Sequence, residues 1–333
     1  MRMKYALTLA GNIIVDTTKY IEAYPDKLEL TAITGVSRST GGSLPNVGID
    51  LARLDPSLPI KAIGFVGEDD NGAYALETLG RYPNIDLRDV RRRGVNSFTD
   101  VMTVESTGER TFFTYKGADR YLDGDAIDLD RLDCDIFHAA YALLLDGLDA
   151  PDPEYGTVMA KVLHGAQARG HLTSMDVVSE RSDRYGRIVP PALRYTDYFS
   201  VNEMEASRIT GVDLTSSFSE AAAEKALRML RDMGVRRWAV IHTPALSCGL
   251  DEKGRFLTRE TVSLPEGFIR GSVGAGDAFT AGLLLLAWRG ADLDQAMMTA
   301  NAVAAMSLSQ PGATDGVPSL DEVTAFAARM GYL

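Results

Sequence analysis

The stretch GSVGAGDAF, residues 271–279, places two glycines and an alanine directly before an aspartate and a long apolar run. The run predicts a helix that begins near Ala275. The N–H groups of Gly274, Ala275 and Gly276 would be unpaired donors at the start of that helix, where small side chains and the helix dipole favour a phosphate. Asp277 would repel this anion unless it reaches past it to remove a proton from a hydroxyl. Close helix-to-strand packing, with Asp277 as a capping acid, is the alternative.

The composition is that of a globular chain. Its 333 residues are 45% hydrophobic and 24% charged, which suffices for one large α/β domain or two smaller ones. A net charge of −12 argues against nucleic acid and against an anionic membrane as partners. The one dense basic run, residues 91–93, stands near Asp86 and Asp89 and is typical of a solvated loop.

The cysteines and the N-terminus favour a cytoplasmic protein. Cys134 and Cys248 lie far apart in the sequence and form no metal-type pair, which fits a reducing compartment. The first 16 residues lead into a strand-like stretch without the cleavage pattern of a signal peptide. The longest apolar runs, such as residues 281–288, are too short to span a bilayer.

Short apolar runs alternate with helical patterns along most of the chain. The periodicity predicts strands over residues 5–16, 60–68, 134–142, 172–178, 197–202 and 237–243, and helices over residues 72–82, 156–170, 217–234 and 294–312. Ser217 and Glu220 have the spacing of a capping box, and Gly234 stands where a helix C-terminal glycine belongs. This order predicts an α/β fold with a mostly parallel sheet covered by helices on both faces.

Two stretches break this alternation. Residues 17–40 and 95–116 are rich in Thr, Ser, Val, Phe and Tyr, and the second holds two β-type runs around a Thr-Gly turn. They predict a small antiparallel sheet at one edge of the main sheet that could act as a lid. The core would then comprise residues 1–16, 41–94 and 117–333. An ordinary β extension with a structural or dimerising role is the alternative.

Further polar residues stand at predicted strand ends and helix starts. Asp16 ends the first strand and can accept two hydroxyl hydrogen bonds, and Gly42 with Asn46 joins glycine to asparagine where a helix begins, a pattern that suits sugar hydroxyls. Asn202 and Glu205 stand at a strand-to-helix junction, where oxygen ligands could organise Mg²⁺ through water. Taken singly, each motif also has an account as a turn, a cap or a solvated acid.

Taken together, these motifs resemble the PfkB family of carbohydrate kinases, the ribokinase-like family. The resemblance covers nearly the whole chain, through GNIIVD, GGSLPN, GEDDNG, TGERTFF, SVNEMEA, GSVGAGDAF and ANAVAAMSLSQPGA. It implies a ribokinase-like three-layer α/β/α fold with a β lid that closes over the sugar, and it implies ATP and Mg²⁺ as cofactors.

The resemblance also implies a role for each site residue. In the GAGD motif, Asp277 would be the catalytic base, with an anion hole formed by Gly274, Ala275 and Gly276. The acceptor hydroxyls would be held by Asp16, Gly42 and Asn46. The nucleotide side would comprise Asn202 and Glu205, which hold Mg²⁺ through water, and Asn301, which lies near the adenine.

The chain departs from the family pattern at Gly271-Ser272-Val273, where members often have Asp-Thr-Thr or Asp-Thr-Val. The missing carboxylate helps to hold a monovalent cation in ribokinase-like members, so we expect no large dependence of the rate on K⁺. The D-x-N-x-R segment of the family appears as DVVSER, which keeps Asp176.

The expected reaction is transfer of the γ-phosphoryl group of ATP to a hydroxymethyl group of a sugar or sugar-like molecule. A nucleoside kinase is the nearest alternative, because the aromatic residues Phe98, Phe112, Phe113 and Tyr115 could form a base platform or could be lid core. A non-catalytic sugar or nucleotide sensor is the alternative from another class, against which Asp277 counts. An exposed lid edge would also favour a homodimer.

Overall fold

The computed structural model describes residues 4–332, and its centre is a nine-stranded sheet. In sheet order the strands are β15 (Phe256–Glu260), β14 (Leu246–Leu250), β13 (Trp238–His242), β12 (Tyr198–Asn202), β11 (Leu172–Val177), β8 (Cys134–Ala142), β1 (Tyr5–Gly11), β4 (Ile60–Val66) and β5 (Ile85–Arg92). Neighbours from β13 to β5 pair in parallel, whereas β14 and β15 pair antiparallel. The predicted mostly parallel sheet is confirmed.

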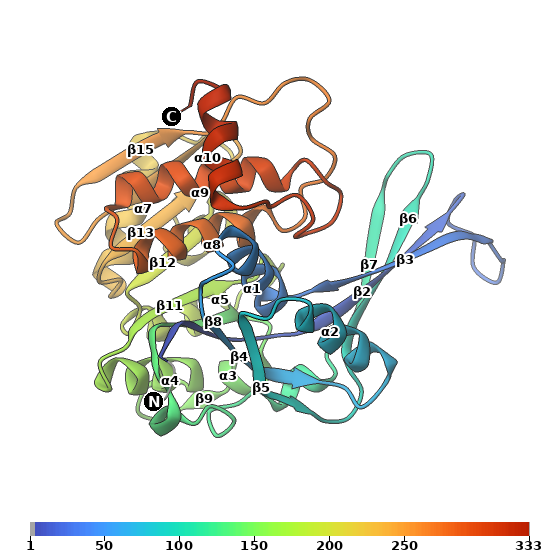
Figure 1. Ribbon diagram of the computed structural model, residues 1–333, viewed down its shortest axis with the longest axis horizontal. Coiled ribbons are helices and arrows are strands. Elements are labelled where there is room, and N and C mark those ends of the chain that lie inside the picture. The colour runs from blue at the N-terminus through green and yellow to red at the C-terminus, as the bar shows by residue number, and fades with distance from the viewer. Residues whose placement is uncertain (1–3, 333) are drawn as a thin grey trace.

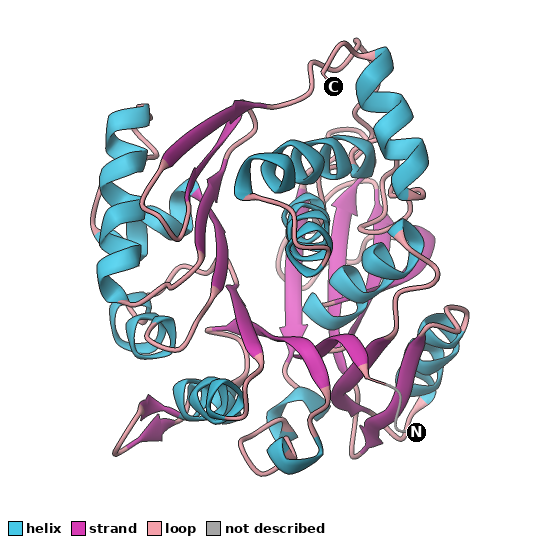
Figure 2. Ribbon diagram, turned by 60° about the vertical axis from the view of Figure 1, so that its left-hand side comes forward, coloured by secondary structure: helices cyan, strands magenta, loops and turns pink. Residues whose placement is uncertain are grey.

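Helices cover both faces of this sheet, as Figures 1 and 2 show. One face carries α1 (Ser43–Leu54), α2 (Asp70–Gly80), α8 (Ala275–Trp288), α9 (Leu293–Ser307) and α10 (Leu320–Arg329). The other carries α3 (Asp146–Asp149), α4 (Val158–Ala168), α5 (Tyr185–Leu193), α6 (Glu203–Thr210) and α7 (Glu220–Met233). Short connecting elements are η1 (Ala118–Tyr121), η2 (Leu129–Arg131), β9 (Pro151–Asp152) and β10 (Gly156–Thr157). The predicted α/β/α layering is therefore confirmed.

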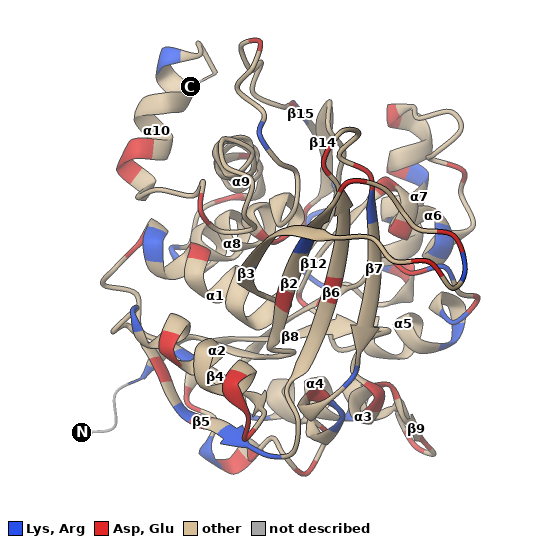
Figure 3. Cartoon of the chain, turned by 90° about the vertical axis from the view of Figure 1, so that its right-hand side faces the viewer, with Lys and Arg blue, Asp and Glu red and all other residues tan. Residues whose placement is uncertain are grey.

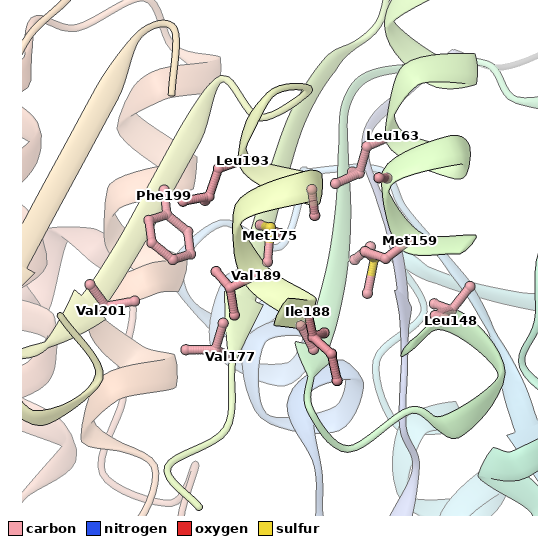
Figure 4. Packing of buried hydrophobic residues seen from close by; sticks show 14 of the residues in the cluster. Leu148, Met159, Leu163, Met175, Val177, Ile188, Val189, Leu193, Phe199 and Val201 are labelled. Atoms are coloured by element: carbon pink, nitrogen blue, oxygen red, sulfur yellow. The ribbon is translucent and has the colours of Figure 1, made fainter. Parts of the chain in front are cut away.

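The sheet separates two hydrophobic cores. Successive side chains of a strand point to opposite faces, so Ile136 of β8 packs with α1 and α8 while the next residue, Phe137, packs with α4 and α5. Figure 4 shows the second core, where Met175 and Phe199 from the strands meet Val189 from α5. Both faces of the sheet are thus buried, which explains why its strands read as continuous apolar runs.

A second sheet of four strands projects from this body (Figure 1) and lies toward the viewer in Figure 3. Its order is β3 (Ile33–Gly41), β2 (Ile14–Ile21), β6 (Ser97–Val104) and β7 (Arg110–Tyr115). The outer pairs are antiparallel, but the central strands β2 and β6 run in parallel, so the expectation of an antiparallel sheet was wrong at its centre. The reason is that β2 follows β1 and β6 follows β5. Since β1 and β5 run in the same direction in the main sheet, the strands that continue from them also run in the same direction.

Two local predictions also need correction. The first strand ends at Gly11, and Asp16 lies on β2 of the projecting sheet rather than at the end of a core strand. Helix α7 begins two residues later than the Ser217 pattern predicted, because the side chain of Ser219 accepts the hydrogen bond from Ala222 N.

Successive strands are added to one side of β1 in the first part of the chain and to its other side, beginning with β8, in the second part. From β1 the chain proceeds to β4 and β5 on one side, and it then returns to β8 and continues to β11, β12 and β13 on the other. Ligands of open α/β sheets bind at such a switch point, outside the carboxyl ends of the strands. Within residues 4–332, no helix is long and apolar enough to cross a membrane.

Candidate active site

Helix α8 begins at the GAGD motif. Gly274 precedes its first turn with a φ of 81°, and a Cβ at this position would lie 2.4 Å from the carbonyl oxygen of Ala313. Only glycine fits here without strain. The N–H of Ala275 points at Ser272 O from 3.4 Å, while the N–H groups of Gly274 and Gly276 have no partner within residues 4–332. The helix therefore begins with open donors, as the anion-hole prediction requires.

Asp277 is the third residue of α8, and only 8% of its surface is exposed. Its Oδ2 accepts a hydrogen bond of 2.9 Å from Asn46 Nδ2 on α1. Its Oδ1 accepts one of 2.5 Å from the hydroxyl of Tyr141, at the end of β8. Side chains from three separate elements thus meet at one carboxylate, which fixes its direction.

Burial raises the pKa of Asp277 to about 6, against the effect of the hydrogen bonds from Tyr141 and Asn46, which lower it. At pH 7 the carboxylate is therefore ionised, but it binds a proton far more readily than an exposed aspartate does. This is the behaviour that a general base needs near neutral pH.

The predicted acceptor residues lie on two segments, the start of α1 and the strand β2. Gly42 precedes α1 with a φ of 92°, and a Cβ there would lie 2.6 Å from the carbonyl oxygen of Asn12. Asn46 follows one turn into α1 and contacts Asp277. Asp16 lies on β2 against Gly41, whose added Cβ would meet the aspartate oxygen at 2.3 Å. Burial raises the pKa of Asp16 to about 6.

Asn202 and Glu205 form a capping box at the start of α6. Asn202 Oδ1 accepts from Glu205 N at 2.9 Å, and Glu205 Oε2 accepts from Asn202 N at 3.0 Å. The other carboxylate oxygen, Oε1, accepts from the hydroxyl of Ser179. The N-x-x-E motif therefore has a structural role as a helix cap, and both side chains still line the cavity in front of α8.

Asp176, at the end of β11, lies in the same cavity wall as Glu205. Burial raises the pKa of both carboxyl groups, that of Glu205 to about 7. Repulsion from Glu205 and Asp277 adds to the pKa shift of Asp176, and repulsion from Asp277 adds to that of Glu205. No Lys or Arg of the described chain lines this cavity, and residues 4–332 contain no cluster of three metal-binding side chains. Among the described residues, Asp176 and Glu205 thus have no positively charged side chain beside them in this cavity. Such a pair of acidic groups fits Mg²⁺, which keeps much of its water and takes few protein ligands.

Two cavities meet at the start of α8. The one that contains Asp277, Asp176 and Glu205 has a volume of about 230 Å³. The larger, of about 670 Å³, has mainly apolar walls and also contains Asn301. Both are bounded by the same five residues, which are Asn202, His242, Ser272, Ala275 and Gly276. They therefore form one cleft, whose narrow end holds the carboxylates.

Asn301 lies in the wall of the larger cavity, and its amide also ties α9 to the chain around it. Its Nδ2 donates to Ser247 Oγ, to the carbonyl of Glu260 and to the hydroxyl of Tyr332. These structural contacts occupy its amide nitrogen, and the expected place near the adenine stays a prediction.

Sequence reasoning missed two residues of the cleft. Tyr141 was read only as the end of a buried strand, although its hydroxyl contacts Asp277. His242, at the end of β13, packs against Phe279 with ring centroids 4.9 Å apart and lines both cavities. Burial lowers its pKa to about 4, so the ring is neutral at pH 7. The signal for both was their position, because each lies at the carboxyl end of a parallel strand.

The comparisons with known proteins agree with this geometry. Residues 9–320 match the pfkB family of carbohydrate kinases. The chain belongs to this family. The recognition from the motifs is thereby confirmed, and so is the prediction that the protein is a carbohydrate kinase by family.

Among curated relatives, an ATP-dependent ribose-1-phosphate kinase from Halopiger xanaduensis is 27% identical over 95% of this chain and 96% of its own length. An aminoimidazole riboside kinase from Salmonella typhimurium is 26% identical over 86% of this chain and 87% of its own. The enzyme therefore belongs among sugar or nucleoside kinases.

Solved structures show the same fold. Arabidopsis thaliana ribokinase, complexed with ribose and ATP, superposes with a TM-score of 0.81 at 22% identity over 97% of this chain and 98% of its own. A ribokinase II from E. coli, solved with ATP and Mg²⁺, gives a TM-score of 0.77 at 19% identity over 98% and 99% of the two chains. The ribokinase-like fold is confirmed, and neighbours with this fold bind ATP and Mg²⁺.

Proposed function

We propose that this kinase transfers the γ-phosphoryl group of ATP to a hydroxymethyl group of a sugar or sugar-like acceptor. The observation that carries the proposal is the placement of Asp277. It is a buried, oriented carboxylate in the first turn of a helix whose first residues have open N–H groups and line the same cavity. One end of that cavity can hold an anion while the carboxylate receives a proton from the acceptor.

The acceptor lies beside Asp16, Gly42 and Asn46 in this proposal. Asp16 accepts hydrogen bonds from two sugar hydroxyls, and Gly42 leaves room for the ring next to the backbone. Asp277 takes the proton of the attacking hydroxyl as the new phosphate ester bond forms and ADP leaves. The N–H groups of Gly274 and Gly276 stabilise the charge on the transferring group.

The nucleotide occupies the larger cavity, with its base between the apolar walls near Asn301 and its phosphates at the start of α8. Asp176, Glu205 and Asn202 hold Mg²⁺ through water in this proposal. When bound, Mg²⁺ would neutralise the negative charge of the ATP phosphates during transfer. The protein itself supplies the carboxylates that place the ion and the apolar walls that hold the base.

A nucleoside acceptor is the second candidate. Phe112, Phe113 and Tyr115 on β7 are more than 40% exposed, and the ring of Phe98 lies 5.3 Å from that of Tyr115. The three exposed rings are therefore not the core of the projecting sheet and remain available to stack on a base. The aminoimidazole riboside kinase among the relatives also favours this candidate.

The sheet of residues 17–40 and 95–116 acts as a lid in this proposal. Lid closure excludes water, so we expect little ATP hydrolysis without an acceptor and a lid position that changes on binding. Its outer strands β3 and β7 have free edges in the described chain, which favours a homodimer through the lid. The cytoplasmic location stays a prediction from the two cysteines, both unpaired and buried.

The test is phosphoryl transfer from ATP to a panel of ribose, fructose, ribose 1-phosphate and purine nucleosides, combined with thermal shifts for the same ligands. Transfer to a free sugar supports the main proposal, and transfer to nucleosides alone supports the second. Ligand-induced stabilisation without any turnover, in the presence of Mg²⁺, would instead indicate a non-catalytic sensor.

A further inference from the structure

Asp50 is a fully buried carboxylate in α1, one helical turn beyond Asn46. Neither of its oxygens has a hydrogen-bond partner among the described residues, and the Oδ1 of Asn46 also lacks one. Buried polar atoms without partners are rare in folded proteins and call for a physical explanation. Here three unpaired acceptor oxygens lie within one turn of the helix that contacts Asp277.

Of the charged groups around Asp50, Arg53 favours its ionised form, whereas two carboxyl groups oppose it. Asp277 approaches from α8 and Asp315 from the segment after α9, and both are acidic. Arg53, on α1 itself, donates instead to the carbonyl oxygens of Thr314 and Asp315. Burial and the nearby Asp277 raise the pKa of Asp50 well above its usual range. A fully buried carboxyl group without a partner and with acidic neighbours favours its protonated form, which has an O–H group to donate.

Residues four positions apart on a helix are neighbours, and Asp–amide hydrogen bonds form at this spacing. The nitrogen of Asn46 already donates to Asp277, which leaves its Oδ1 as the open acceptor. We propose that protonated Asp50 donates to Oδ1 of Asn46 and so fixes this amide with its nitrogen toward Asp277. Asp50 is then a positioning residue for the base, and this role rests on the proposed function.

The chain of donors runs in one direction, from Asp50 to Asn46 to Asp277. An amide turned the other way would place its carbonyl oxygen against the carboxylate, which repels it. Tyr141 would then be the one remaining donor to Asp277, with Asp176 and Glu205 as the other carboxylates that face it. The base would bind its proton more tightly and would be ionised only at higher pH.

Two variants of similar size separate this role from a structural one. Asp50→Asn keeps a donor and should retain kcat within a few-fold. Asp50→Leu removes the donor and should lower kcat by about 10- to 100-fold, the order expected for one hydrogen bond to a charged group. The acid limb of its kcat profile should also move to higher pH. Its melting temperature should change little, because the loss of the hydrogen bond to Asn46 is offset by the removal of a buried polar carboxyl group.

A control is Thr8→Val, which removes another buried oxygen without a partner, in the middle of β1. It should leave the pH profile unchanged. The proposal is overturned if Asp50→Leu keeps both kcat and the pH profile, or if Asp50→Asn loses as much activity as Asp50→Leu. Activity lost in proportion to melting temperature in both variants would also overturn it.

A measurement that does not depend on turnover tests the same claim. Carbon-13 labelling of the aspartate carboxyl groups gives a resonance for Asp50, which is assigned by its loss in Asp50→Asn. We expect the chemical shift of a protonated carboxyl throughout pH 5–8. A carboxylate shift at pH 7 would overturn the proposal, even if the enzyme phosphorylates none of the acceptors tested.

Discussion

The hydroxyl of Tyr141 donates a 2.5 Å hydrogen bond to Asp277, although the two residues are 136 positions apart in the sequence. Asn46, on α1, donates a hydrogen bond to the other oxygen of this carboxylate, so each oxygen has one donor. Burial raises the pKa of Tyr141 well above its usual range, so the phenol stays a donor at every physiological pH. The base is thus held in place by two side chains that do not change their charge.

Tyr141→Phe should raise the pKa of Asp277, because the variant loses a donor to the ionised carboxylate. We expect the acid limb of kcat/KM to move to higher pH, with little change in melting temperature. A pH profile of the purified variant checks this. Tyr5→Phe is the matched control, since Tyr5 donates to Asp86 outside the cleft. An unchanged acid limb in Tyr141→Phe would contradict the role given to this hydroxyl.

Stability without ligands should fall as pH rises from about 5 to 7.5. Several buried carboxyl groups have folded pKa values of about 6 to 7, above their unfolded values, so the folded state binds more protons in this window. These groups are Asp16, Asp119, Asp149, Glu205 and Asp277. Buried His138 and His242, with pKa lowered to about 4, act in the opposite direction but are fewer.

Melting temperatures at constant ionic strength between pH 5 and pH 7.5 test this expectation. Mg²⁺ with an ATP analogue should reduce the decline, because it stabilises the ionised carboxylates of the cleft. A melting temperature that rises steadily across this window would show that the buried carboxyl groups titrate at their ordinary pKa.

Much of the fold could be predicted from the sequence, because parallel strands buried on both faces appear as uninterrupted apolar runs. The strand pairing in the projecting sheet of β3, β2, β6 and β7 was harder to predict. The parallel pairing of β2 with β6 joins segments about 80 residues apart and depends on where each leaves the body. Local patterns of Thr and Val contain no such information.

The cleft was predictable only in part. The GAGD turn could be interpreted because its glycines and helix start are local features of the sequence. Tyr141 and Asp50 could not, since each becomes notable only through contacts or burial set by distant segments. The motif of Asn202 and Glu205 is local but ambiguous. The same spacing suits both a helix cap and a ligand site, and the sequence alone does not distinguish them.

The rate should depend little on K⁺. Gly271 lacks the carboxylate found in many relatives, and a Cβ at this position would lie 2.8 Å from Cα of Pro311. The neighbouring segment therefore fills the space that a side chain would need. Initial rates in K⁺ and Na⁺ at fixed ionic strength check this. Many-fold activation by K⁺ over Na⁺ would show that other groups build a cation site.

The lid should mediate a homodimer. Phe112 and Phe113 on its edge strand β7 are 61% and 55% exposed, which is unusual for phenylalanines of a monomer. Light scattering at micromolar concentration should give twice the mass of the chain. Phe113→Glu should shift it toward the monomer, whereas Tyr24→Glu, in the loop between β2 and β3, serves as an exposed control. A monomeric wild-type protein would contradict the expectation.

Asp277→Asn tests the central claim most directly, because it keeps the shape of the side chain and removes the base. The account predicts that kcat falls by about 10² to 10⁴ while the affinities for ATP and acceptor change only a few-fold. The melting temperature should stay near that of the wild type, since asparagine can accept the hydrogen bond from Asn46 through its oxygen while its amide nitrogen donates to the hydroxyl of Tyr141. If Asp277 merely caps its helix, the variant will be about as active as the wild type. A kcat near the wild-type value would contradict the mechanism proposed for this kinase.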